Sequence, residues 1–254
     1  MLRLRHDDPV ALSLSRAIRN GDLGSLGQLL RKHPDLVTAR IEKNGKSRSP
    51  LHVATDWPGG FPNGPAVIAA LIDAGADPNA RCEGMYHTET PLHRVAGSDD
   101  VEAFQVLVKA GADIEASGGS IGGGTPLDNA VGYGQWQVAR RLVERGAGVK
   151  LWHAAALGLM SRVEADFADH PTPTSEDITV AFYQACAGGQ RETAEYLLGR
   201  GADINWIPNW GSKKKTPLDV ARDHDSAINR GPLAESLVGW LTSRGAKSAA
   251  EVIA

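Results

Sequence analysis

The sequence has little cysteine, few aromatic residues and no excess of either charge. Its 254 residues include two cysteines, Cys82 and Cys186, which lie far apart and outside the paired spacing of zinc sites. We therefore expect neither a disulfide framework nor a metal site, and no cofactor. The formal net charge of -3 gives no overall field that would attract nucleic acid, so a nucleic-acid partner is not expected either.

Long apolar runs are also missing. No stretch approaches the roughly 18 consecutive apolar residues of a membrane span. The first ten residues carry Arg3, Arg5, Asp7 and Asp8, which interrupt the apolar region that a secretion signal needs. The hydrophobic share of 42% is typical of a packed soluble chain. The expectation is a soluble, cytoplasmic monomer without a membrane partner.

What the sequence does contain is a repeated pattern. A Thr-Pro-Leu-His or Thr-Pro-Leu-Asp motif stands at residues 90–93, 125–128 and 216–219, and Pro50-Leu51-His52 is a shortened copy. The period is about 33 residues with insertions. A second helical stretch after each copy ends in Gly-Ala, and the Gly-Ala pairs of the chain lie at residues 75–76, 111–112, 146–147, 201–202 and 245–246.

The motif has a physical interpretation as a pair of short helices. Thr90 can cap a helix whose first residue is Pro91, because proline already has a helical φ. A second helix is predicted from about Val101, with Leu107 on its apolar face, and Gly111 ends it in a left-handed conformation. One such pair cannot bury its apolar face alone, so the pattern predicts stacking of neighbouring units.

These motifs and their period resemble ankyrin repeats along nearly the whole chain. The resemblance implies an all-α solenoid of stacked helix pairs with short β-hairpin fingers, formed as one domain over residues 1–254. Residues 148–152 leave no room for a finger. The predicted parts are a degenerate capping repeat at 9–40, repeats at about 49–80, 90–116, 125–149, 150–174, 175–205 and 216–247, and a closing cap at 248–254. The capping repeat is expected to hold helices near 9–20 and 22–32, and the last repeat carries extra residues between its helices. Ser248 and Glu251 have the spacing of a capping box.

The resemblance also implies a function. In this family the residues that meet partners come from the finger tips and from positions just after the Ala pair of the first helix. The expected role is recognition of a partner protein or peptide on a concave groove. The candidate binding residues are Asp56, Trp57, Phe61, Met85, Tyr86, His87, Arg94, Ser98, Asn129, Tyr133, His153, Trp206 and Trp210.

Simpler interpretations exist for several of these residues. Trp57 and Trp210 could merely pin their own loops. The insertion at 56–65, which lies between the helices of the second repeat, is either functional or a tolerated surface loop. His52 and His93 share one repeat position and are predicted to be structural. His153 is placed outside that row and facing the groove.

The alternative function is a small-molecule-binding protein or enzyme that uses a pocket between the 56–65 loop and the 81–89 finger. Its first candidate catalytic residues are His87, Asp56 and Glu89, but solvated charge on a finger is the preferred interpretation of His87 and Glu89.

Two further motifs are interpreted as loops. Residues 118–122 read Gly-Gly-Ser-Ile-Gly, yet the hydrolase elbow needs an α/β sheet that is not predicted, so Ser120 is expected in a flexible finger with little side-chain contact. The lysine run at 213–215 is expected to be solvated.

Overall fold

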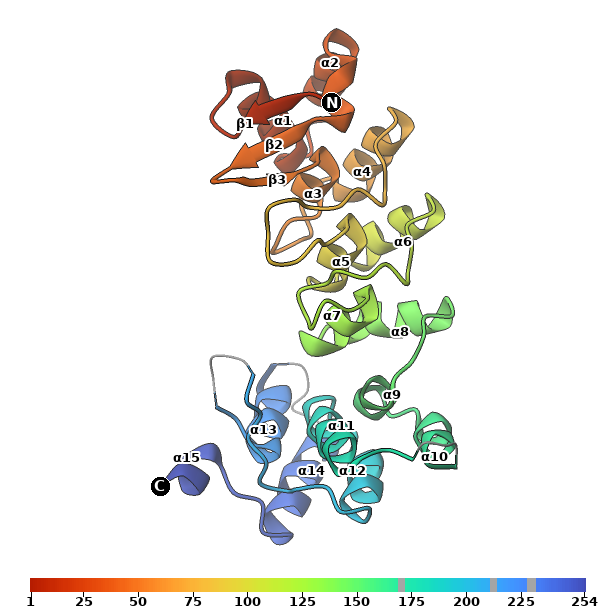
Figure 1. Cartoon of the computed structure of the whole chain (residues 1–254), viewed down its shortest axis with the longest axis vertical. Coiled ribbons are helices and arrows are strands. Elements are labelled where there is room, and N and C mark those ends of the chain that lie inside the picture. The colour runs from red at the N-terminus through yellow and green to blue at the C-terminus, as the bar shows by residue number, and fades with distance from the viewer. Residues whose placement is uncertain (169–171, 211–213, 228–231) are drawn as a thin grey trace. The chain divides into compact units, whose positions relative to one another are not determined.

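The computed structural model describes residues 1–168, 172–210, 214–227 and 232–254, with the side chains at 224–236 outside the described set. The chain divides into two compact units, Met1–Gly148 and Val149–Ala254 (Figure 1). The boundary falls in the junction at 148–152, where the sequence leaves no room for a finger. Two predictions fall partly outside the described residues: the lysine run, through Lys213, and the extra residues between the last two long helices, at 228–231.

The first unit contains most of the recurring motifs. Its elements in chain order are β1 (Arg3–Arg5), α1 (Pro9–Arg19), α2 (Leu23–Lys32), the 3-10 turn η1 (Pro34–Thr38), β2 (Arg40–Lys43), β3 (Lys46–Arg48), α3 (Pro50–Ala54), α4 (Gly64–Asp73), α5 (Pro91–Ala96), α6 (Val101–Lys109), α7 (Pro126–Gly132) and α8 (Trp136–Glu144). The two helices predicted for the capping repeat and the helices after each Thr-Pro or Ser-Pro are therefore confirmed.

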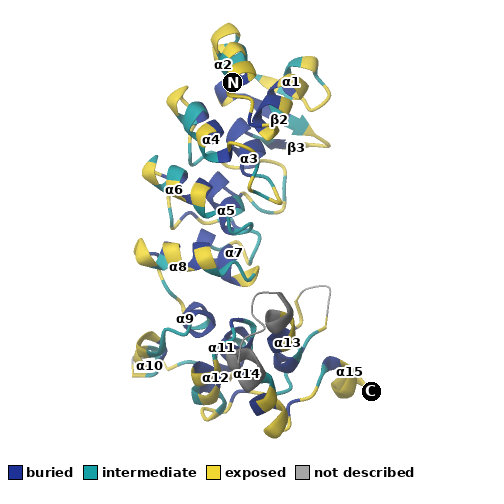
Figure 2. Ribbon diagram, turned by 180° about the vertical axis from the view of Figure 1, so that it is seen from behind, coloured by how far each residue is buried: buried dark blue, intermediate teal, exposed yellow. Residues whose placement is uncertain are grey.

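The helix pairs of this unit stack in two rows. α3, α5 and α7 follow one another in one row, and α4, α6 and α8 in the other (Figure 1). α5 and α7 are largely buried, whereas α6 and α8 bury one face and expose the other (Figure 2). The sequence determines which face of α6 is buried. Its apolar residues recur at helical spacing, and two of them, Phe104 and Leu107, are fully buried.

The helices α3, α5 and α7 each begin with a reciprocal cap. In α7, Thr125 Oγ1 accepts from the Asp128 backbone N–H at 3.4 Å, and Asp128 Oδ2 accepts from the Thr125 N–H at 2.6 Å. His93 has the corresponding role for Thr90 in α5. At the other end of the pair, Gly111 adopts a φ of 87°, where a side chain would be strained.

The prediction of a fold without a sheet beyond hairpin fingers is wrong at the N-terminus. A three-stranded sheet has the order β1-β2-β3, with β1 parallel to β2 and β2 antiparallel to β3. β2 and β3 form a hairpin of the expected kind. β1 adds to it through pairing of Arg3 with Arg40 and Leu4 with Ile41, a contact between segments too short and too distant in the chain to carry a sequence signal.

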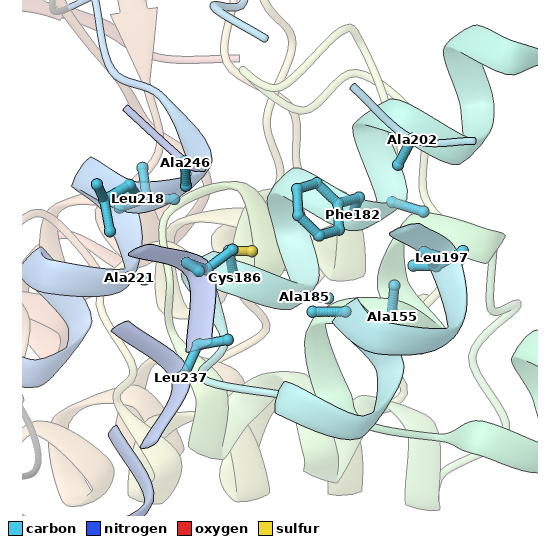
Figure 3. Packing of buried hydrophobic residues seen from close by; sticks show 14 of the residues in the cluster. Ala155, Phe182, Ala185, Cys186, Leu197, Ala202, Leu218, Ala221, Leu237 and Ala246 are labelled. Carbon is cyan, nitrogen blue, oxygen red and sulfur yellow. The ribbon is translucent and has the colours of Figure 1, made fainter. Parts of the chain in front are cut away.

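The second unit has its own core. Its elements are α9 (Leu151–Leu157), α10 (Met160–Ala168), α11 (Ser175–Ala187), α12 (Arg191–Leu198), α13 (Pro217–Ala227), α14 (Pro232–Ser243) and α15 (Ala249–Ile253). Phe182 and Cys186 on α11 pack with buried residues of the helices around it, among them Ala155, Leu197 and Leu237 (Figure 3). The closing helix α15 has the predicted capping box between Ser248 and Glu251.

Replacing Leu107 with alanine should lower the free energy of unfolding by about 2–5 kcal/mol, because a fully buried leucine would leave a cavity between neighbouring helix pairs. Urea unfolding followed by circular dichroism measures the change. The matched control is Glu102→Ala on the exposed face of the same helix, which should change stability by less than about 0.5 kcal/mol. An equally small effect at Leu107 would contradict the described packing.

Candidate functional site

A cleft of about 410 Å³ lies within the first unit. It is bounded by the 56–65 loop, the finger at 81–89, the first helices α5 and α7, and the glycine-rich segment before α7. Its lining combines aromatic and polar side chains, a composition typical of recognition sites. The lining residues are Trp57, His87, Glu89, His93, Arg94, Gly97, Ser120, Asn129, Tyr133 and Gln135.

The carboxylate of Glu89 is buried at the base of this cleft, with 8% of its side chain exposed. Its Oε1 atom accepts hydrogen bonds from Asn129 Nδ2 at 2.8 Å and from the Ser120 backbone N–H at 3.3 Å. Its Oε2 atom faces His87 Nδ1 at 3.4 Å and Arg94 Nε at 3.9 Å. Groups from the finger, α5, α7 and the glycine-rich segment thus meet at one side chain.

Glu89 stays ionised despite its burial. Burial has the largest effect and by itself would raise the pKa of Glu89, but the hydrogen bonds from Ser120 and Asn129 and the nearby His87 and Arg94 together hold it below its ordinary value. The prediction of solvated charge on the finger is therefore wrong for Glu89. The burial depends on donors that lie 31 and 40 residues further along the chain.

Two nitrogen atoms beside Glu89 are buried yet incompletely bonded. His87 Nδ1 and Arg94 Nε make no hydrogen bond within the described part of the chain. Arg94 instead directs Nη1 to Asp56 Oδ1 at 2.8 Å, and its Nη2 lies 3.8 Å from Cys82 Sγ. Both nitrogen atoms lie near Glu89 Oε2, at 3.4 and 3.9 Å, so attraction to that carboxylate compensates in part for their missing hydrogen bonds.

The glycine-rich segment is folded tightly against this network. The backbone N–H groups of Gly118 and Gly119 donate to the carbonyls of Gly123 and Gly124 at 2.8 Å. A Cβ atom on Gly119 would lie 2.6 Å from Asn129 Oδ1, so only glycine allows this approach. The expectation of a flexible finger with little side-chain contact is wrong, since Ser120 Oγ lies 3.1 Å from Tyr133 Oη.

Two exposed aromatic residues stand at the rim of the cleft. Trp57, on the 56–65 loop, is 79% exposed, and Tyr133, at the end of α7, is 51% exposed. Gly97 on the floor leaves space beside the Tyr133 ring. Large aromatic surfaces left in water next to buried polar groups are typical of binding hot spots.

The 56–65 loop is fixed by both of its neighbours. The backbone N–H of Gly60 donates to Asp100 Oδ2 at 2.9 Å, in the pair that follows. Asn63 Nδ2 donates to the Gly21 carbonyl at 3.0 Å, in the capping repeat. The insertion is therefore an ordered part of the cleft wall, and Trp57 is not needed to pin it.

The remaining predicted residues lie elsewhere. Asp56 is adjacent to the cleft through Arg94, and Phe61 and Ser98 are half-buried outside the lining. Tyr86 is fully exposed on the finger and Met85 lines a different depression beside β2 and β3. Trp206 and Trp210 belong to the second unit, where their rings pack edge to face at 5.0 Å.

The expectation that His153 faces a groove is wrong. It is fully buried and caps α9, accepting from the Lys150 backbone N–H at 3.1 Å as His93 does from Thr90. His153 is therefore the structural histidine of its repeat, which the unusual Lys150 in the threonine position concealed. Sequence reasoning also missed Gln135 and Ser120 as lining residues. The run of glycines before Asn129 was a usable signal for close packing at Ser120.

The chain was compared with models of known families. Residues 60–152 match the family described as ankyrin repeats, in three copies. Residues 60–152 of this chain are ankyrin repeats. Nearly all of the residues that line the cleft lie within this matched range. The ankyrin repeats and the mostly helical structure fit a solenoid of helix pairs. The total of seven repeats stays a prediction.

Ankyrin repeats are generally protein-interaction modules, so protein partners are expected for this chain. Within the described ranges, no helix is long and apolar enough to cross a membrane. The same ranges contain no group of three or more His, Cys, Asp or Glu side chains arranged to hold a metal ion.

Two buried histidines, His52 and His93, make stability depend on pH. Burial lowers the pKa of His52 to about 3 and also lowers that of His93, so both are neutral in the folded chain. Below the ordinary histidine pKa of about 6.5 the unfolded chain takes up protons that the folded chain does not, so stability is full above this pH and falls as the pH is lowered.

We expect His52 alone to remove about 1.4 kcal/mol of stability between about pH 7.5 and pH 5.5. Urea unfolding at the two pH values measures the loss. The His52→Gln variant, which cannot titrate, should show a smaller loss than the wild-type chain. An identical loss in both proteins would contradict the assignment.

Proposed function

We propose that this chain binds a segment of a partner protein in the cleft between the 56–65 loop and the 81–89 finger. The observation that carries the proposal is the pairing of two exposed aromatic side chains, Trp57 and Tyr133, with a fixed polar floor at Glu89, Arg94 and Asn129. Aromatic residues supply large contact area at low entropic cost, and the rigid floor limits the ordering needed on binding.

A peptide fits this arrangement better than a compact ligand. Both rim aromatics are at least half exposed, so the cleft is open along its edge. The side-chain amide of Gln135 lines the cleft and makes no hydrogen bond to the described residues, so its donor and acceptor are available to a peptide backbone. The groove positions that ankyrin repeats use for partners include the turn that carries Tyr133.

The alternative of an enzyme or small-molecule site has less support. Ser120 Oγ contacts Tyr133 Oη and Asn129 Oδ1, neither of which is a base that could activate it. His87 and Glu89 face each other, but Glu89 is already held by Asn129 and Ser120. This arrangement favours a stable buried charge at Glu89 over the transfer of a proton between His87 and Glu89.

The proposal can be tested with a phage-displayed random-peptide library selected on the whole chain. We expect the recovered peptides, made synthetically, to lose about tenfold or more in affinity towards Trp57→Ala and Tyr133→Ala, because truncated hot-spot aromatics cost about 1–4 kcal/mol. Fluorescence anisotropy measures the affinity, and thermal unfolding should change little since both rings are exposed.

Leu12→Ala is the matched control. It removes an exposed apolar side chain of the same unit, on α1, outside the cleft lining. Its affinity for the peptides should equal that of the wild-type chain. Failure to recover any binding peptide, or equal binding by the Trp57→Ala and Tyr133→Ala variants, would overturn the proposal.

A further inference from the structure

Asp56, next to the rim residue Trp57, is shared by three arginine side chains. Arg94 Nη1 lies 2.8 Å from its Oδ1 atom, while Arg48 Nη1 and Arg19 Nη2 lie 2.6 and 2.9 Å from Oδ2. The three arginines come from α5, β3 and α1, so three successive units of the stack contribute one each. Asp56 acts as the common counter-ion that brings them together.

The charges at this place do not balance. Three guanidinium groups face two carboxylates, those of Asp56 and Glu89, which leaves one positive charge in excess. The carboxylate of Asp100, on which the 56–65 loop rests, makes no ion pair with these arginines in the described part of the chain and accepts from the backbone N–H groups of Gly60 and Ala103. Only Arg94 of the three arginines lines the cleft, and Arg19 and Arg48 lie beside it through their shared contact with Asp56. Like charges gathered beside a cleft favour a ligand of opposite charge.

The arginines also have N–H groups that do not contact Asp56. A guanidinium carries five N–H groups, and both Arg19 and Arg48 direct a single nitrogen to Asp56. Their side chains are 46% and 31% exposed, so their other donors are accessible from solvent. A carboxylate can accept two parallel hydrogen bonds from one such group, a strong and directional contact.

We propose that the partner segment is acidic: an Asp or Glu side chain pairs with Arg19 and Arg48, and a neighbouring apolar side chain lies between Trp57 and Tyr133. This inference rests on the proposed function and adds the chemistry of the ligand. A carboxylate matches the single excess positive charge. A phosphorylated residue, with a charge of about -1.5 to -2, would exceed it and meet stronger repulsion from Asp56.

The test uses a peptide recovered from the random library on the wild-type chain. We expect an Asp or Glu in the recovered sequences. Replacing it with Asn or Gln should weaken binding about tenfold, as should Arg19→Gln in the protein. Combining the two changes should weaken binding little further, because both remove the same contact. Arg48→Gln is the second variant and should behave like Arg19→Gln.

The matched control is Arg141→Gln, an exposed arginine of α8 that pairs with Glu144 and lies outside the cleft. It should leave affinity unchanged. Peptides that need Trp57 and Tyr133 but tolerate loss of their acidic residue would overturn this inference and leave the proposed function standing. A phosphoserine peptide that binds more tightly than its Asp counterpart would also overturn it. Peptides whose affinity is unchanged by Trp57→Ala and Tyr133→Ala would overturn both proposals.

Discussion

The structure around the cleft depends on the buried carboxylate of Glu89. An ionised group out of water destabilises the fold unless its charge and its hydrogen bonds are compensated. Here the compensation comes from the Asn129 amide, the Ser120 backbone N–H and the neighbouring Arg94, all from segments that follow the finger. Satisfying one charge therefore fixes the relative positions of the finger, α5, α7 and the glycine-rich segment, which are the walls of the proposed binding site.

Two neutral histidines, His52 and His93, hold together the backbone segments that form these walls. Nδ1 of His52 accepts from the Ser49 N–H, so its Nε2 carries the proton and donates to the Glu89 carbonyl at 2.9 Å. His93 repeats the arrangement with Thr90 and the Gly124 carbonyl at 3.1 Å. Each first helix thus holds the finger that follows it. A cleft fixed in this way loses little conformational entropy when a ligand binds, which favours tight recognition of a flexible segment.

Local signals were enough to predict the helix pairs but not the buried charge. Thr90 before Pro91, and Ser248 with Glu251, are caps that adjacent residues decide, so the sequence predicts them correctly. Glu89 stands in a polar finger, and its burial depends on Asn129, 40 residues later. The pairing of β1 with β2 and the docking of Gly60 on Asp100 are likewise contacts between distant segments. The three arginines that share Asp56 were not predicted for the same reason, because they lie far apart in the sequence.

Glu89 is a buried anion held by its neighbours, and the ionisation of this side chain can be measured. The carbon-13 shift of its carboxyl group, assigned by comparison with Glu89→Gln, can be followed by NMR as the pH is lowered. We expect a titration midpoint below the ordinary glutamate pKa of about 4.3. A midpoint at or above that value would mean that burial prevails over the hydrogen bonds of Asn129 and Ser120, and that the walls of the cleft are not held by a buried charge at Glu89.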